Sequence, residues 1–444
     1  MVPSAWITSV AGFVRKHPRR AAIGAGTLVA LVVAVCWSDL LGWTAAPTSV
    51  DRAGASPRPH TYETPFAAPP MANVRLPTLG GDELCGYGPV PVVDGLPQIP
   101  PDIEAKAESA FHRLAVDLAA GSTDRERALG TYLHLIEVWS AAGRDRASAH
   151  GDCAGDDGSC QSAAAEVMWI ATADQRRALV RLATSTSDAD AYAMAMYSCG
   201  PTLAKTSHDD CALLSSAQWA KIEPDNAVPW LYLGAEAERR RDRSGLEAAL
   251  FRASKSRYSD PHMDAISRLL ASDAYERVPP PVQPRLAVAL LGVQAALPLA
   301  ALQVATQYCG GSAPTDSRAE TCGDLAALLI EHGRTAIEVF VGSKIAERIG
   351  WSDSRLSALH DDADAMRWRL YMAPQSLQEH VLLSCDSLQQ LRRTMTAAAQ
   401  LGEAGAVRRD LAESGVSASQ AAEQWRAETR RKASEQTSAQ GATH

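Results

Sequence analysis

The chain has 444 residues, enough for two or three domains or one long solenoid. Aromatic residues make up only 6% of it and Ala is abundant, a composition that favours closely packed helices over a β-sandwich. The formal net charge is -8, and most of the chain is more acidic than this because residues 1–20 are basic, which argues against nucleic acid as a partner.

A basic cluster precedes an apolar stretch at the start of the chain. Residues 1–20 hold four Lys or Arg side chains and no carboxylate, and residues 21–43 carry one charge, Asp39. With Trp37 and Trp43 as interfacial anchors, the stretch reaches the length of about 20 residues that crosses a bilayer. We therefore predict a cytoplasmic basic N-terminus (1–20), a transmembrane signal anchor (21–43) in a bacterial inner membrane, and a periplasmic C-terminal domain. A cleaved secretory signal is the alternative, and it also exports the remainder.

Residues 44–101 are rich in proline and hold twelve of the 25 prolines of the chain. Such a segment cannot continue a helix, so we predict a spacer that lifts the following domain off the membrane. Its second half, around residues 84–93, is more apolar, and we expect it to pack on the domain as an extended strap tied by Cys85.

From residue 102 to 432 the spacing of apolar residues predicts helices almost without interruption. Capping-box patterns begin at Thr123, Ser244, Ser317 and Ser376, each followed three residues later by Glu. The predicted helices span about 102–120, 123–142, 162–184, 188–199, 210–221, 227–241, 245–257, 262–275, 284–308, 318–348, 353–371, 376–401 and 404–432. Residues 433–444 are polar, and we predict a disordered tail.

Residues 219–258 carry the pattern of one helical-repeat unit with the end of the unit before it. The matching residues are Pro224, Trp230, Leu233, Gly234 and Ala253. The stretch resembles a tetratricopeptide unit, with Ala237 in place of an aromatic residue and Leu246 in place of Ala. The resemblance implies an all-α fold: an irregular α/α superhelix of tetratricopeptide-like helical hairpins over 102–432, after the single transmembrane helix and the spacer.

Residues 286–305 are uncharged and contain Gln294, Pro298 and Gln303. A second membrane span is one interpretation of this stretch. The two glutamines and the proline favour the other, a buried central helix of the solenoid.

Eight of the nine cysteines lie outside the apolar N-terminal stretch. Six of them form local pairs across loop-like sequence, which in an exported protein indicates disulfides. The predicted pairs are Cys153 with Cys160, Cys199 with Cys211, and Cys309 with Cys322. Cys85 and Cys385 are left either as a long-range bridge or, for Cys385, as a buried free thiol.

No established catalytic or nucleotide-binding motif occurs in the sequence. Metal-like groupings occur at His360 with Asp364, at His208 with Cys199 and Cys211, and at His150 beside Cys153 and Cys160. We interpret the first as a solvated helix face and the other two as neighbours of disulfides. We therefore predict no cofactor, no metal and no catalytic residue.

The function that the resemblance implies is recognition of protein partners in the cell envelope, through a concave groove. The residues that we expect to line it are Tyr232, Glu236 and Arg239, on the first helix of the repeat-like unit. One alternative is an enzyme that acts on an envelope polymer with a cleft carboxylate such as Glu166, Glu236 or Asp364. The other is a structural subunit of an envelope assembly.

Overall fold

The computed structural model describes residues 83–93, 96–150, 158–200, 210–297, 301–310, 316–378 and 384–441. The predicted basic N-terminus, the signal anchor and most of the spacer lie outside these residues. In the described part of the chain, no helix is both long enough and apolar enough to cross a bilayer.

The described part is helical apart from two short antiparallel hairpins at its start. The hairpins pair β1 (Glu83–Leu84) with β2 (Gly88–Pro89) and β3 (Val92–Val93) with β4 (Leu96–Pro97). The first helices are α4 (Pro101–Ala119), α5 (Asp124–His150), α6 (Gly158–Ala171), α7 (Ala173–Ser185), α8 (Ala189–Cys199), the 3-10 helix η1 (Asp210–Leu213), α9 (Ser216–Ile222), α10 (Ala227–Arg239) and α11 (Arg243–Ser254). The remaining helices are α12 (Ala265–Leu270), α13 (Asp273–Glu276), α14 (Gln283–Ala296), α15 (Leu302–Cys309), α16 (Asp316–His332), α17 (Ala336–Arg348), α18 (Asp353–Gln378), α19 (Cys385–Glu413) and α20 (Ala418–Gly441).

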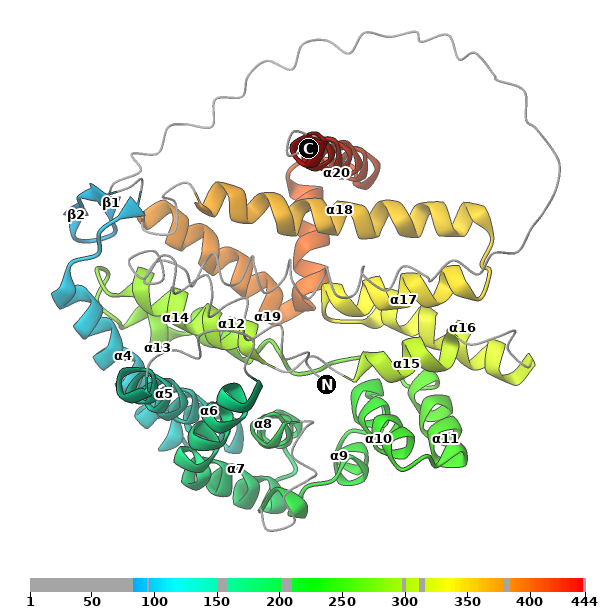
Figure 1. Cartoon of the computed structure of the whole chain (residues 1–444), viewed down its shortest axis with the longest axis horizontal. Coiled ribbons are helices and arrows are strands. Elements are labelled where there is room, and N and C mark those ends of the chain that lie inside the picture. Colours follow the sequence, from blue (N-terminus) through cyan, green and yellow to red (C-terminus); the bar gives the residue numbers. More distant parts are fainter. Residues whose placement is uncertain are drawn as a thin grey trace, which may run out of the picture.

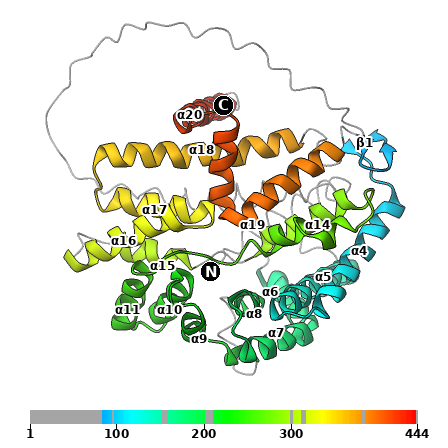
Figure 2. The ribbon, with the colours of Figure 1, turned by 180° about the vertical axis from the view of Figure 1, so that it is seen from behind.

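Helices that follow one another in the chain pack against each other along an arc from α4 to α11 (Figures 1 and 2). The arc continues through α16, which packs on α11, and then through α17 and α18 to α20. Contacts between distant helices also close the array, because α14 packs on α4 and α12 packs on both α14 and α19. The fold is therefore all-α and compatible with a helical repeat, with later helices filling the space beside the arc.

The connection from α11 to α12 crosses the middle of the molecule (Figure 1). It is held by backbone hydrogen bonds on both sides. The amide of Ala227 donates to the carbonyl of Tyr258 at 2.9 Å, and the amide of Ser259 donates to the carbonyl of His332 at 3.1 Å. Residues 258–264 therefore form a central loop that touches the start of α10 and the turn between α16 and α17.

Among the described residues, three cysteine pairs are joined by disulfides. Two are the local pairs Cys199–Cys211 and Cys309–Cys322. The third is Cys85–Cys385, which ties the first hairpin to the start of α19 across a sequence separation of 300. Of the two alternatives that the sequence left open for these cysteines, the structure has the bridge. Cys153 lies outside the described residues, so the pair with Cys160 stays a prediction.

Several boundaries differ from the sequence-based prediction. The stretch predicted as one helix over 318–348 is two helices, because a capping box between Thr335 and Glu338 starts α17. The stretch over 284–308 is likewise divided into α14 and α15, and the stretch over 162–184 into α6 and α7. The box at Thr123 does form, whereas Asp242 rather than Ser244 caps α11, and residue 376 lies inside α18. Helix α20 continues to Gly441, through most of the tail predicted as disordered.

Close helix contacts occur at glycines other than the one in the repeat pattern. A Cβ atom at Gly234 would lie 3.6 Å from the Leu246 side chain, an ordinary contact distance. At Gly130 a Cβ atom would lie 2.1 Å from the backbone nitrogen of Ala119. The closest approach therefore joins α4 to α5, whereas Gly234 of the repeat pattern makes only ordinary contacts.

Candidate functional site

The repeat-like hairpin of α10 and α11 is fixed by its caps. The side chain of Asn226 accepts from the amide of Val228 at 3.1 Å, and that of Asp242 accepts from the amide of Gly245 at 2.9 Å. The indole of Trp230 donates to the carbonyl of Pro224 at 3.0 Å. Two residues of the repeat signature therefore act together, since the hydrogen bond fixes Trp230 over the entry turn of its own helix.

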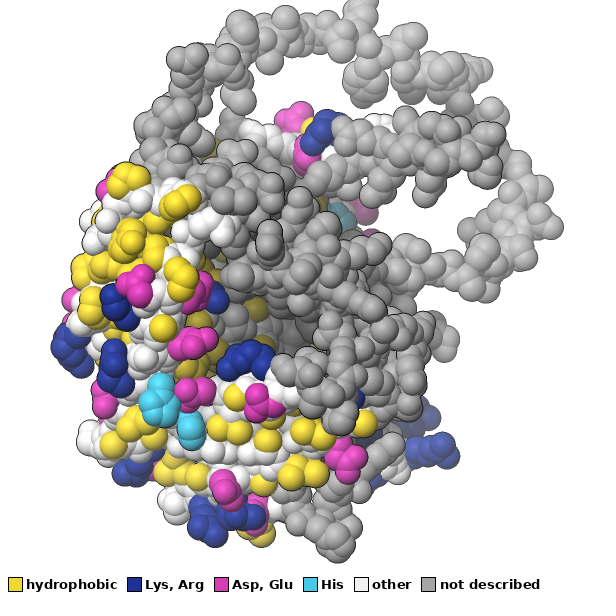
Figure 3. All heavy atoms as spheres, turned by 60° about the vertical axis from the view of Figure 1, so that its left-hand side comes forward, with side chains coloured by type: hydrophobic (Ala, Val, Ile, Leu, Met, Phe, Trp, Pro, Cys, Tyr) yellow, Lys and Arg dark blue, Asp and Glu magenta, His cyan; other side chains and the backbone are white. Residues whose placement is uncertain are grey.

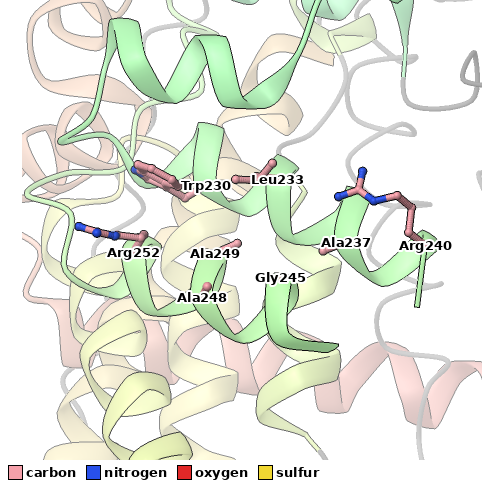
Figure 4. A pocket seen from close by; sticks show the side chains of 8 residues that line it. All are labelled: Trp230, Leu233, Ala237, Arg240, Gly245, Ala248, Ala249 and Arg252. Atoms are coloured by element: carbon pink, nitrogen blue, oxygen red, sulfur yellow. The ribbon is translucent and has the colours of Figure 1, made fainter. Parts of the chain in front are cut away.

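A groove runs between the two helices of this hairpin (Figure 4). Its lining comes from α10 through Trp230, Leu233, Ala237 and Arg240, and from α11 through Gly245, Ala248, Ala249 and Arg252. The floor is apolar, with Ala237 and Ala249 buried. Trp230 and Arg252 lie at one end and Arg240 at the other, and both arginines are exposed. The groove thus combines an apolar floor with a cation at each end.

The three residues predicted to bind a partner lie on other faces of α10. Tyr232 packs against Trp219, with ring centroids 5.6 Å apart. Glu236 accepts a hydrogen bond from Ser216 of α9. Arg239 is exposed. Tyr232 and Glu236 thus face α9, and the groove toward α11 is lined by other residues that sequence reasoning treated as repeat signature or passed over.

A second concentration of polar groups surrounds the central loop and is buried. We call it the buried junction, and its histidine, His262, is only 7% exposed. The Nδ1 atom of His262 lies 2.8 Å from Asp190 of α8, and Nε2 lies 2.9 Å from Glu223 at the end of α9. Arg268 of α12 donates to the same Asp190 oxygen at 2.8 Å. The imidazole ring of His262 therefore joins α8 to the end of α9, and Arg268 joins α12 to the same carboxylate of α8.

Two further arginines complete the charge balance of the buried junction. Arg334 lies 3.1 Å from Asp260 and 2.9 Å from Asp264. Arg125 of α5 pairs with Asp190. The charged groups of the buried junction are Asp190, Glu223, Asp260, Asp264, His262, Arg125, Arg268 and Arg334. Each buried carboxylate of the junction therefore lies beside at least one cation, while Arg125 is half-exposed and also contacts Asp188 at 3.3 Å.

The electrostatics of the buried junction make His262 a structural cation. Burial alone would lower its pKa, but the hydrogen bonds to Asp190 and Glu223 outweigh burial and raise the pKa to about 10. For Asp190, burial works to raise the pKa, and the contacts with His262 and Arg268 bring it below its ordinary value. Both ring nitrogens of His262 therefore carry protons at neutral pH, and the ring has no lone pair for general-base catalysis or metal binding.

Beside the buried junction, Glu338 is the carboxyl group whose pKa burial raises most clearly. It is fully buried, and burial raises its pKa to about 7 against the hydrogen bonds from Ser259 and Thr335. Its Oε2 atom accepts from the amide of Thr335 at 2.9 Å and so caps α17. A carboxyl group that is closed off from solvent and used as a helix cap cannot reach a substrate.

The carboxylates that the enzyme alternative requires do not converge. Glu166 is exposed on α6, Glu236 lies on α10 and Asp364 on α18, in different parts of the molecule (Figure 1). Asp364 is paired with Arg367 at 2.6 Å and with Arg426 at 2.8 Å. Nothing in the described part of the chain therefore assembles these three groups into one cleft.

One metal-like grouping noted in the sequence contains two cysteines that are joined in a disulfide, and another grouping becomes apparent only in the structure. Cys199 and Cys211 are joined to each other, so neither is a thiolate ligand. Within the described residues, His112, His134 and Glu137 offer ligand atoms that lie within 4.8 Å of one another. The signal for this group was the spacing of His134 and Glu137 on one helix, but its third member is on the preceding helix.

Comparison with protein-family models, with curated proteins and with solved structures finds no match to this chain.

Proposed function

We propose that this chain is a membrane-anchored periplasmic protein of the tetratricopeptide-like class that binds a partner protein in the groove between α10 and α11. The observation that carries the proposal is the lining of this groove, an apolar floor with an exposed arginine at each end. The partner that fits is a protein segment with an apolar side chain flanked by carboxylates.

The chemistry of the groove suits such a segment. Buried small residues on the floor leave room for a partner side chain and contribute by removing apolar surface from water. The guanidinium groups of Arg240 and Arg252 can each hold a carboxylate through two parallel hydrogen bonds. Trp and Arg are also the residues that most often dominate binding energy at protein interfaces. Arg240 lies 3.8 Å from Glu236, a contact long enough to exchange for a partner carboxylate.

The cellular location is part of the proposal. Disulfides persist in oxidising compartments, and the pairs Cys85–Cys385, Cys199–Cys211 and Cys309–Cys322 support an exported domain. The apolar residues 21–43 supply the anchor. The proposal therefore places the helical domain on the outer side of the inner membrane.

The test begins with a photo-crosslinking amino acid at Ala248, which is exposed in the groove, in the full chain expressed in its own cells. The crosslinked peptide is identified by mass spectrometry, and its synthetic form is titrated into the purified full chain. We expect a segment with carboxylates beside an apolar residue, and Arg240→Glu with Arg252→Glu to weaken its binding at least tenfold.

The matched control is Arg239→Glu, which reverses a charge of the same helix outside the groove. It should leave the affinity for the peptide unchanged. Binding that survives the double reversal, or that Arg239→Glu weakens equally, would contradict the groove. A crosslinked segment without carboxylates would contradict the partner chemistry.

A further inference from the structure

Three side chains with metal-ligand chemistry meet on the outer surface of the α4–α5 hairpin. We call them the His–Glu cluster: His112 of α4, with His134 and Glu137 of α5. The Nδ1 atom of His112 lies 3.0 Å from Oε2 of Glu137, and the Nδ1 atom of His134 lies 3.0 Å from the same oxygen. Two histidines with carboxylates beside them are visible on this face in Figure 3.

The hairpin holds this group together by its tight crossing. At Gly130, one turn before His134, α5 approaches the backbone of α4 so closely that a Cβ atom would meet the nitrogen of Ala119 at 2.1 Å. The capping box of Thr123 and Glu126 fixes where α5 begins relative to the end of α4. The two imidazole rings consequently lie with centroids 6.1 Å apart and an interplanar angle of 68°. Their arrangement is set by packing rather than by loops.

The cluster is charged and open to solvent in the way that a metal site needs. Glu137 supplies a carboxylate, and its Oε2 atom lies 3.0 Å from the Nδ1 atoms of both His112 and His134. The side chains of His112, His134 and Glu137 are 52%, 39% and 32% exposed. An ion can therefore reach the cluster, and water can occupy a remaining coordination position.

We propose that the His–Glu cluster binds one divalent transition-metal ion, with His112, His134 and Glu137 as its protein ligands. The separations of 3.0 Å between each ring nitrogen and the shared oxygen are close to the edge of about 3.3 Å expected for tetrahedral bonds of about 2.0–2.1 Å. Imidazole ligands select Zn²⁺, Cu²⁺, Ni²⁺ or Fe²⁺ over Mg²⁺ and Ca²⁺. Three ligands leave a fourth position for water or for a group from another molecule.

This inference is independent of the groove on α10 and α11. The cluster lies on the first helical hairpin, whereas the groove lies at the other end of the arc (Figure 1). Either proposal can fail while the other stands.

The experiment uses the full chain without an affinity tag, stripped of metal by a chelator. Zn²⁺ is titrated by calorimetry, and Co²⁺ is added as a spectroscopic probe of four-coordinate geometry. We expect binding of Zn²⁺ that His134→Ala and Glu137→Gln each weaken at least tenfold, visible Co²⁺ absorption of tetrahedral type, and no competition from Mg²⁺. Zn²⁺ should also raise the unfolding temperature of the wild type more than that of either variant.

The control is His332→Ala, which removes an exposed histidine at the end of α16. It should leave Zn²⁺ affinity and the Co²⁺ spectrum unchanged, while circular dichroism verifies that each variant keeps its helices. Glu137→Gln keeps the shape of the side chain and serves as the decisive variant if His134→Ala fails to fold. Absence of Zn²⁺ binding, or binding that the cluster variants leave intact, would overturn the proposal and leave a hydrogen-bonded surface group.

Discussion

The buried junction and the His–Glu cluster use the same kinds of side chain in opposite proportions. In the buried junction one imidazole, His262, sits between two carboxylates, those of Asp190 and Glu223. In the His–Glu cluster two imidazoles share one carboxylate, that of Glu137. The first is closed to solvent and the second is open, with His112 half-exposed.

The ratio of imidazole to carboxylate groups and the degree of burial together determine what each histidine can do. Two buried carboxylates need a cation between them, so His262 holds both protons and acts as a fixed positive charge. A single carboxylate shared by two rings gives neither ring this double pairing. Each ring of the surface cluster makes one such contact, through its Nδ1 atom, and both rings are exposed enough for an ion from solution to compete with it. A histidine flanked by acidic residues can therefore be either a buried structural cation or an exposed group that an ion from solution can reach.

The largest effect on stability should come from removing the buried imidazole ring of His262. His262→Ala leaves Asp190 and Glu223 buried without their cation, and we expect the free energy of unfolding to fall by about 3–5 kcal/mol in urea denaturation near pH 7. The folded pKa of about 10 lies above the ordinary value of 6.5, so the stabilisation is complete below pH 6.5 and is lost as the pH rises through 10. The difference between wild type and variant should shrink over that range. A loss below about 1 kcal/mol would show that His262 is not a structural cation.

A second prediction concerns Glu338, which touches the central loop without a cation of its own. Its pKa is raised from 4.5 to about 7, so the neutral acid is favoured and stability falls as the pH rises from 4.5 through 7. This shift corresponds to about 3 kcal/mol. Glu338→Gln keeps the cap on α17 and should be more stable than the wild type by about that amount at pH 8, but equal to it near pH 4.5. Parallel stability curves for the two proteins would contradict the raised pKa.

Gly130→Ala tests the packing that brings the surface imidazoles together. The added Cβ atom would collide with the α4 backbone, so α4 and α5 must separate, and we expect a loss of about 1–3 kcal/mol in unfolding free energy. Zn²⁺ affinity should fall as well, because His112 moves away from His134. The matched control is Gly234→Ala, whose Cβ atom meets only ordinary contacts and which should be neutral or slightly stabilising. A stable Gly130→Ala protein with full Zn²⁺ affinity would contradict the proposed role of this crossing.

The smallest effect should come from removing the exposed ring. His112→Ala breaks a contact between side chains open to water, and we expect less than about 0.5 kcal/mol of change in unfolding free energy without metal. When both variants are measured under the same conditions, His112→Ala and His262→Ala give the changes in unfolding free energy for an exposed ring and for a buried ring. A large loss at His112 would mean that this surface group, like the buried one, holds the fold together.

Local features of the fold were predictable from the sequence, and features that join distant segments were not. The capping box at Thr123 and the contact between Trp230 and Pro224 each depend on residues within one turn or one repeat unit. The contact of His262 with Asp190 spans 72 residues, and no periodicity indicates which loop enters the core. His112 could not be predicted from the sequence as a ligand, because its distance to Glu137 depends on how α4 and α5 cross.

The repeat-like hairpin shows the same limit on a smaller scale. Its two helices follow from the sequence, but the cap of α11 is Asp242 rather than the predicted Ser244, and which face of α10 is open depends on where α9 packs. Sequence reasoning placed the binding surface on Tyr232, Glu236 and Arg239, whereas the groove toward α11 is lined by Trp230, Leu233 and Arg240. Neighbouring helices cover one side of α10 and leave the other accessible.

The bond between Cys85 and Cys385 also determines how the chain would transmit mechanical load. Tension applied between the N-terminal segment and α20 would pass directly from residue 85 to residue 385 and bypass the 300-residue span between them. Among the described elements, β1, α19 and α20 would lie in the covalently loaded path. The α10–α11 hairpin lies within the bypassed span and would carry no tension along its backbone. Pulling on either end of the chain would therefore not act on a molecule bound there.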